Sequence, residues 1–76
     1  AHLQQLFGEA MQELQAGRQA EALALFLLVR EQLKSGLLFT ATTQNIARIL
    51  TEQGHYKQAY EWLRPIQRQL SGEYLF

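Results

Sequence analysis

Residues 47–63 read ARILTEQGHYKQAYEWL, and residues 10–26 read AMQELQAGRQAEALALF. Both stretches carry alanine, glycine and alanine at the same three places: Ala10, Gly17 and Ala22 in the first, and Ala47, Gly54 and Ala59 in the second. Each residue of the second set follows its counterpart by 37 positions. In both stretches a helical apolar pattern runs into the glycine, and a second helical pattern follows it. A repeat of this length is typical of stacked helical hairpins.

Apolar residues at i, i+3 and i+4 spacing continue outward from the two stretches and predict four helices. They are expected at about Leu3 to Gln15, Gln19 to Lys34, a start between Leu38 and Thr42 to Gln53, and Tyr56 to Leu70. No segment alternates with period two for long enough to be a strand. The sequence therefore predicts an all-α fold.

Glycines are predicted to end these helices, because glycine tolerates the positive φ that is common after a helix C-terminus. We assign this role to four places: Gly17, Gly36, Gly54 and Ser71-Gly72. Lys34 would then lie near the negative end of the second helix dipole, where a cation is favourable.

Two further features concern the third and fourth helices. The hydroxyl groups of Thr40, Thr42 and Thr43 are candidate caps for the start of the third helix. Pro65 lies inside the fourth helix and has no N–H to donate to the carbonyl of Glu61, so we expect a kink there.

Composition limits the kind of partner. The chain has 76 residues, with seven Lys plus Arg against seven Asp plus Glu, and it has no Cys. A zero net charge argues against a nucleic-acid or anionic-membrane partner, since both depend on a basic field. No apolar run reaches the roughly 18 residues of a membrane span, so we expect no membrane partner and a cytoplasmic location.

The sequence offers no set of residues for catalysis. His2 stands near the first residue and His55 in an expected turn, which argues against a metal site. Cys and Asp are absent, and Ser35 and Ser71 both lie in expected turns, so no nucleophile, base and orienting group come together. The single glycines form no phosphate-binding loop. We therefore predict no enzyme activity, no cofactor and no metal.

The repeated pattern extends to Phe26 in the first copy and to Tyr56 and Leu63 in the second. With the repeated alanines and glycines, these positions make the sequence resemble tetratricopeptide repeats, in which small residues let two helices pack closely. The resemblance implies two antiparallel helical hairpins, stacked right-handed in one domain. The expected parts are a first repeat at about residues 3–35, a second at about 38–71 and a tail at 72–76.

The sequence departs from this family in places. Gln19 stands where the first copy should carry an aromatic residue, and the spacing of 37 exceeds the family's usual length of about 34 residues. A narrower similarity covers residues 46–66, which look like helical repeats at the C-terminal ends of large bacterial signalling ATPases and transcription regulators. Pro65 stands at the place of a proline in those segments.

In tetratricopeptide arrays the first helix of each hairpin lines a concave face. The resemblance therefore implies a partner-binding groove with an apolar half and a polar half: Phe7, Met11 and Leu14 from the first copy, and Gln44, Arg48 and Thr51 from the second. Such a surface suits an amphipathic helix or an extended peptide of a partner. The alternative is that the three apolar residues belong to the core.

The second helix carries more apolar residues than one hairpin needs. Leu25 and Leu28 lie off the stripe that is formed by Leu23, Phe26 and Val29. We predict that these two leucines face another protein chain, either a second copy or a distinct partner. Burial under the neighbouring hairpin and tail is the alternative.

Together these features predict a protein–protein interaction module. It would act as a small chaperone or adaptor, or as an oligomerisation or regulatory segment. The alternative is a DNA-binding domain of a transcription regulator, because residues 43–63 have a faint similarity to a helix-turn-helix. Thr51 replaces the glycine that this motif favours, and the following helix has few polar side chains to read bases.

Overall fold

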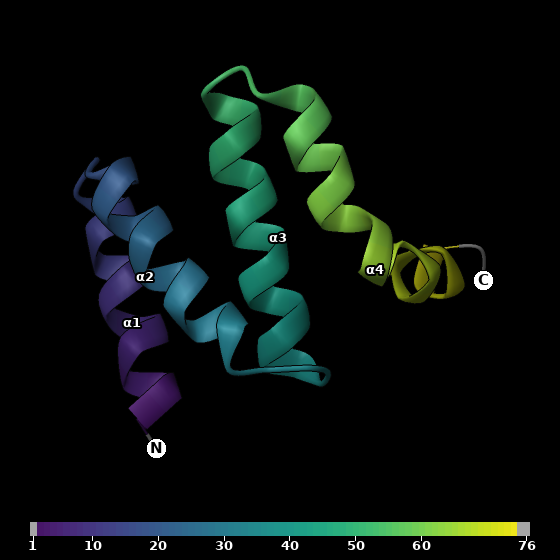
Figure 1. Cartoon of the computed structure of the whole chain (residues 1–76), viewed down its shortest axis with the longest axis horizontal. Coiled ribbons are helices and arrows are strands. Elements are labelled where there is room, and N and C mark those ends of the chain that lie inside the picture. Colours follow the sequence, from purple (N-terminus) through teal and green to yellow (C-terminus); the bar gives the residue numbers. More distant parts are fainter. Residues whose placement is uncertain (1, 75–76) are drawn as a thin grey trace.

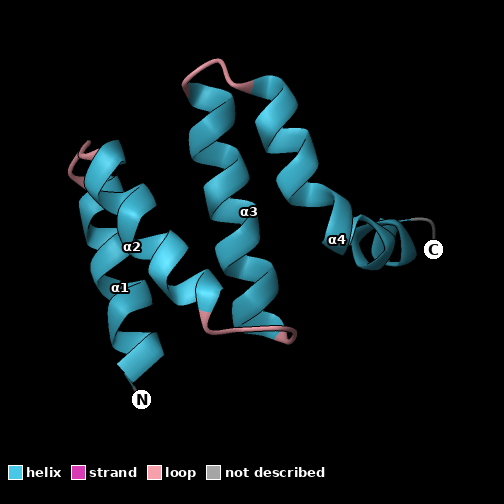
Figure 2. Ribbon diagram, viewed as in Figure 1, coloured by secondary structure: helices cyan, strands magenta, loops and turns pink. Residues whose placement is uncertain are grey.

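The computed structural model describes the backbone of residues 2–74 and the side chains of residues 2–66. Four α-helices make up most of this part: α1 (His2–Gln15), α2 (Gln19–Glu31), α3 (Leu37–Glu52) and α4 (Tyr56–Tyr74) (Figure 1). Residues 2–74 contain no β-strand (Figure 2). The predicted all-α fold with four helices is therefore confirmed.

Helices that follow one another in the sequence lie side by side. α1 packs against α2, α2 against α3, and α3 against α4, as Figure 1 shows. Short turns join α1 to α2 and α3 to α4. Two helical hairpins require this order of contacts, whereas their right-handed, tetratricopeptide-like stacking stays a prediction.

The two short turns have the same geometry. Gly17 and Gly54 have φ values of 85° and 87°, which glycine adopts freely. The backbone N–H after each glycine reaches back five residues: Arg18 to the Glu13 carbonyl at 2.9 Å, and His55 to the Leu50 carbonyl at 2.8 Å. These bonds form the Schellman pattern of a helix C-terminus. The prediction that these two glycines end helices is confirmed.

α2 ends earlier than the sequence predicts. Its last residue is Glu31 and not Lys34. The N–H of Gln32 bonds the carbonyl of Val29 at 3.2 Å, and this i to i−3 bond tightens and closes the last turn. The predicted place of Lys34 at the helix end is wrong, because Arg30 is the basic residue in the last turn of α2.

Gly36 begins α3 instead of ending α2, so this part of the prediction is also wrong. Its φ of 99° and ψ of 179° lie in a region open almost only to glycine. Its carbonyl accepts the N–H of Thr40 at 3.0 Å, which starts the helical hydrogen-bond ladder. α3 therefore begins at Leu37, one residue before the predicted range.

The threonines near the start of α3 lie inside the helix and do not cap it. The side chains of Thr42 and Thr43 are fully buried. Thr43 Oγ1 donates to the Phe39 carbonyl at 2.8 Å, a bond that satisfies a hydroxyl within a helix. The capping prediction is wrong because α3 already begins at Leu37, with Gly36 at the N-cap position.

α4 is longer than predicted, and it is bent. It runs through Ser71-Gly72 to Tyr74, so this dipeptide does not end it; a glycine inside a helix costs about 1 kcal/mol relative to alanine but does not prevent the helix. Pro65 lies within α4, and Figure 1 shows that the helix axis turns in its second half, as expected at a proline. Of the predicted tail, Leu75 and Phe76 lie outside the described residues.

One hydrophobic cluster joins all four helices: Ala10, Ala22, Phe26, Ile46, Ala47, Ile49, Leu50 and Ala59. The repeated alanines are at most 3% exposed, so their small side chains sit where neighbouring helices approach each other. This packing fixes the surfaces on both sides of α4, where one hollow opens toward α3 and another toward α2.

Candidate functional site

A shallow hollow opens between α3 and α4, and we call it the α3–α4 hollow. It has a volume of about 500 Å³ and is lined by Gln44, Ala47, Arg48, Thr51, Glu52 and Leu63. Ala47 is buried and Leu63 is half-buried, whereas the other four side chains are exposed. The hollow thus has an apolar floor and a polar rim.

The internal repeat explains why this hollow is open. At the 37-residue spacing, its three main α3 positions correspond to apolar residues of α1: Gln44 to Phe7, Arg48 to Met11, and Thr51 to Leu14. The three α1 side chains are partly buried against the core, and the Phe7 ring meets the Phe26 ring edge-on at 5.5 Å between centroids. Large apolar side chains therefore occupy the equivalent place in the first copy, while polar side chains leave it open in the second.

Two tyrosines of α4 extend this surface. Tyr56 and Tyr60 are 68% and 56% exposed and lie one helical turn apart. Tyr60 precedes Leu63 by three positions, so both lie on the same side of α4. Exposed aromatic side chains are enriched at protein interfaces. Neither tyrosine lines the hollow itself, but both rings lie on the side of α4 that carries Leu63.

Polar contacts hold the rim of the hollow in place. Arg48 Nε lies 3.4 Å from Glu52 Oε2, with both side chains exposed. Glu52 Oε1 also accepts a hydrogen bond of 2.6 Å from Gln19 Nε2 of α2, and Thr51 Oγ1 donates to the Ala47 carbonyl at 2.8 Å. Because the charged rim residues pair with each other, the hollow presents an apolar surface rather than an excess of one charge.

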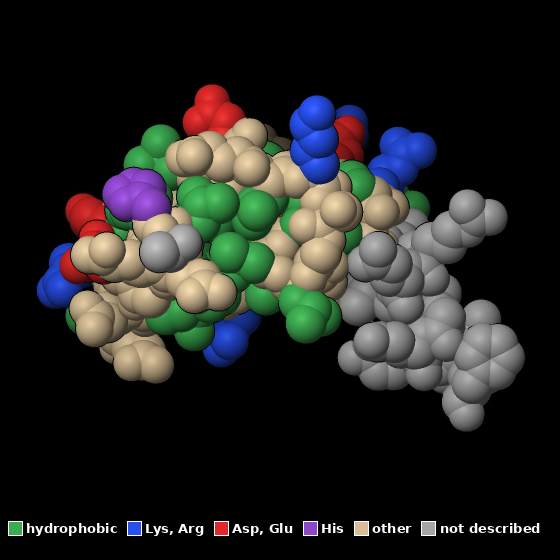
Figure 3. All heavy atoms as spheres, turned by 90° about the horizontal axis from the view of Figure 1, so that it is seen from below, with side chains coloured by type: hydrophobic (Ala, Val, Ile, Leu, Met, Phe, Trp, Pro, Cys, Tyr) green, Lys and Arg blue, Asp and Glu red, His purple; other side chains and the backbone are tan. Residues whose placement is uncertain are grey.

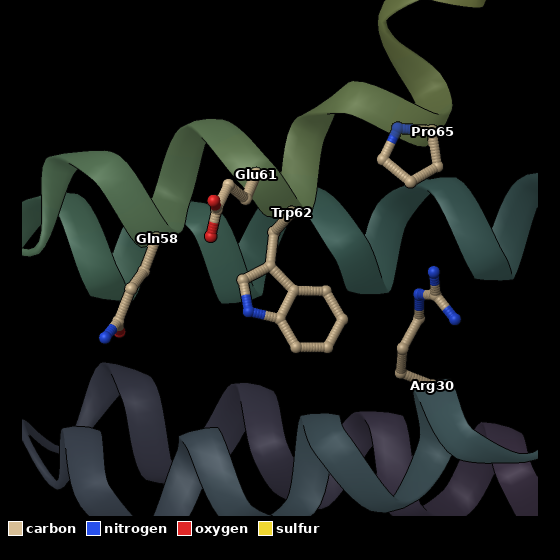
Figure 4. A pocket seen from close by; sticks show the side chains of 5 residues that line it. All are labelled: Arg30, Gln58, Glu61, Trp62 and Pro65. Carbon is tan, nitrogen blue, oxygen red and sulfur yellow. The ribbon is translucent and has the colours of Figure 1, made fainter.

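A second hollow lies on the other side of α4, and we call it the α2–α4 hollow. It has a volume of about 370 Å³ and is lined by Arg30, Gln58, Glu61, Trp62 and Pro65. Figure 4 shows Trp62 extending from α4 toward α2, while Arg30 extends from α2 toward the bend of α4 at Pro65. The bend and the two long side chains shape this hollow.

Arg30 connects three helices. Its guanidinium carbon lies 3.9 Å from the ring centroid of Phe39 on α3 and 5.5 Å from that of Trp62 on α4. Arg30 Nε donates to Thr43 Oγ1 at 2.9 Å. Burial lowers the pKa of the Arg30 guanidinium from its usual range, because desolvation disfavours the charged form.

Sequence reasoning missed both Arg30 and Trp62 as site residues. The position of Arg30 could have indicated its role. Arg30 directly follows the apolar run 22–29, in a helix that is hydrophobic on several sides. A charge at the end of such a run has to find polar or aromatic partners on neighbouring helices.

The structure does not bring the six predicted groove residues into one hollow. Gln44, Arg48 and Thr51 line the α3–α4 hollow, whereas the three apolar residues of α1 pack against the core. Of the two predicted interface leucines, Leu25 packs against the core and Leu28 is 47% exposed. Their binding roles stay predictions.

One end of the molecule also presents apolar side chains. Figure 3 shows the end at which α1 and α3 begin, with hydrophobic side chains gathered in its middle and charged ones at its edge. Leu37, the first residue of α3, is 92% exposed. Leu37 is not among the lining residues of the two hollows described above.

Within residues 2–74, none of the four helices combines the length and hydrophobicity needed to cross a membrane. Among residues 2–66, whose side chains the structure describes, no group of three or more His, Cys, Asp or Glu side chains is placed to bind a metal ion. Both hollows beside α4 combine an apolar surface with polar side chains that a ligand could contact.

Comparisons of this chain with protein-family profiles, with curated protein sequences and with solved structures find no significant match. The resemblance to tetratricopeptide repeats thus stands on the chain's own repeat, and the function has to be inferred from the geometry of the two hollows.

Proposed function

We propose that this chain is a protein-interaction domain of tetratricopeptide-like type, whose α3–α4 hollow receives apolar side chains from an amphipathic helix of a partner. The observation that carries the proposal is the difference between the two copies. Large apolar side chains fill the equivalent place in the first copy, and polar ones leave a hollow of about 500 Å³ in the second.

The first copy also indicates what would fill the hollow. Phe7, Met11 and Leu14 are spaced i, i+4 and i+7 on one face of α1, which is the spacing of apolar anchors on an amphipathic helix. A partner helix with large apolar residues at such spacing would cover Ala47 and Leu63 with comparable atoms. Burial of this floor would favour the complex by removing apolar surface from water.

The border of the hollow supports the same occupant. Tyr56 and Tyr60 can cover the flank of a bound helix and still keep their hydroxyl groups in water. The exposed Arg48–Glu52 pair gives the rim no net charge, so a strongly charged peptide would gain little here. The preferred partner segment is therefore apolar on one face and close to neutral on the flanks.

Selection from a displayed library of amphipathic helical peptides tests this function. Peptides enriched on the folded protein should share large apolar residues at i, i+4 or i, i+3 spacing. Thr51→Trp should abolish their binding, because Thr51 is an exposed lining residue and the indole would fill the hollow. The control is Gln12→Trp on the exposed side of α1, which should leave binding unchanged.

Circular dichroism of both variants checks that they fold like the parent protein. If no peptide is enriched, or if enriched peptides bind Thr51→Trp as well as the parent, the α3–α4 hollow is not the binding site and the proposal fails. Equal losses in Thr51→Trp and Gln12→Trp would also reject it, since Gln12 does not line the hollow.

A further inference from the structure

The α2–α4 hollow contains a half-buried cation without a carboxylate partner. Arg30 forms no ion pair within the described part of the chain, where the recorded pairs are those of Arg18 with Glu13 and Arg48 with Glu52. Its one hydrogen bond there is the bond from Nε to Thr43 Oγ1. The two terminal nitrogens therefore keep their donors available.

The surroundings of Arg30 fix the direction of these donors. Thr43 Oγ1 is held by its own bond to the Phe39 carbonyl at 2.8 Å, so it provides a fixed acceptor for Nε. The Phe39 ring covers the guanidinium plane at 3.9 Å, and such cation–π contacts keep the charge in place without neutralising it. The guanidinium is thus held in one position, while its Nη groups bond no acceptor among the side chains of residues 2–66.

A partly desolvated, unpaired charge favours a ligand of opposite charge. Burial lowers the pKa of Arg30, because desolvation disfavours the charged form. A carboxylate accepts two parallel N–H bonds from a guanidinium, and such bonds are stronger than neutral ones. The geometry therefore fits a carboxylate better than a neutral hydrogen-bond acceptor.

The rest of the hollow restricts the ligand further. Trp62 offers an apolar ring face in the middle of the hollow, and Figure 4 shows Glu61 and Gln58 on the far side of that ring from Arg30. The carboxylate of Glu61 opposes ligands with several negative charges, such as phosphate. A ligand with one negative charge and an apolar body suits this hollow, because the charge can pair with Arg30 and the apolar body can contact the ring of Trp62.

We propose that the α2–α4 hollow binds a monocarboxylate on an apolar body, with the carboxylate on the Nη groups of Arg30 and the apolar body on the ring of Trp62. The free acid of a small molecule and the C-terminal residue of a peptide share this chemistry. The site is separate from the α3–α4 hollow and does not depend on the function proposed for it.

The chain provides its own reporter for this site. Trp62 is the single tryptophan of the sequence, so intrinsic tryptophan fluorescence reports on the hollow alone.

The probes are N-acetyl-phenylalanine, its C-terminal amide, inorganic phosphate and an acetylated pentapeptide that ends in phenylalanine. The free acid should change the fluorescence saturably, whereas the amide and phosphate should not. If the pentapeptide binds more tightly than the single residue, the natural ligand is a peptide C-terminus. If the pentapeptide binds equally or more weakly, the natural ligand is a small acid.

Three variants connect the signal to the proposed contacts. Arg30→Gln should weaken binding of N-acetyl-phenylalanine about tenfold or more, because it removes a charge-assisted bond pair. Glu61→Gln should tighten binding several-fold, because it removes the like charge from the same hollow. Arg18→Gln, at the exposed turn between α1 and α2 and among the lining residues of neither hollow, is the control and should leave the affinity unchanged.

Two results would overturn the proposal. The first is a fluorescence response that is absent, or equal for the acid, the amide and phosphate. The second is an unchanged or weakened affinity in Glu61→Gln, a readout that remains available even if Arg30→Gln fails to fold. A merely structural Arg30, which only ties the three helices together, would give no carboxylate-dependent signal in any of these experiments.

Discussion

Two glycines of this chain occupy opposite backbone environments, and their substitutions by alanine should have opposite effects. Gly36 has a φ of 99°, where an alanine is strained by about 1–3 kcal/mol. Gly8 lies in the middle of α1, where alanine is favoured by about 1 kcal/mol. A Cβ atom would meet nothing within 4 Å at either position. The backbone conformation alone therefore decides whether the substitution raises or lowers the free energy of unfolding.

Urea unfolding followed by circular dichroism measures both effects. Gly36→Ala should lower the midpoint, and Gly8→Ala should raise it. If Gly36→Ala were neutral, the start of α3 would not need the positive φ of Gly36.

Among the elements, the helices could be predicted from sequence because their apolar residues recur at helical spacing. The residues at which the helices end could not always be predicted. The Gly17 and Gly54 turns follow a local rule, since each glycine supplies the positive φ that closes a helix. In the sequence, Gly36 resembles Gly17 and Gly54. Its carbonyl, however, accepts the N–H of Thr40, so Gly36 begins α3 and does not end α2. That choice between ending one helix and beginning the next is made by the packing of α2 against α3.

The candidate sites show the same division. Gln44, Arg48 and Thr51 could be chosen from sequence because the resemblance to tetratricopeptide repeats assigns the first helix of each hairpin to the binding face. The role of Arg30 in the α2–α4 hollow could not be predicted, because its contacts Phe39, Thr43 and Trp62 come from two other helices. Contacts of this kind depend on how the second copy packs against the first, which the repeat pattern does not specify.

Pairing between neighbouring helices can be tested at the buried alanines. Ala22 is fully buried and Ala24 is exposed, although both lie in α2. Ala22→Leu should overpack the contact with neighbouring helices and destabilise the protein by about 1–3 kcal/mol. Ala24→Leu adds the same atoms toward solvent and should change stability by less than about 0.5 kcal/mol. Equal thermal midpoints for the two variants would mean that α2 packs through a different face.

On the scale of the whole molecule, the two copies are not equivalent, and this asymmetry creates the surfaces available for binding. The first copy fills its own space with Phe7, Met11 and Leu14, while the second copy exposes Tyr56 and Tyr60 beside an open hollow. α4 therefore contributes to both hollows and to the core at once. Any ligand at either hollow should stabilise the whole fold, because binding to the native state alone shifts the unfolding equilibrium.

The shared core also predicts that both copies unfold together. The buried cluster contains Phe26 from α2 and Ile46 from α3, so neither hairpin keeps its buried surface without the other. Fluorescence of Trp62 follows α4 alone, whereas circular dichroism follows all helices, and their urea transitions should coincide. Phe26→Leu, a substitution in the first copy, should destabilise the fold by about 1 kcal/mol and lower both midpoints equally. If Trp62 kept its original midpoint in that variant, the second copy would be stable alone, and the cluster would hold two independent units in contact rather than one cooperative core.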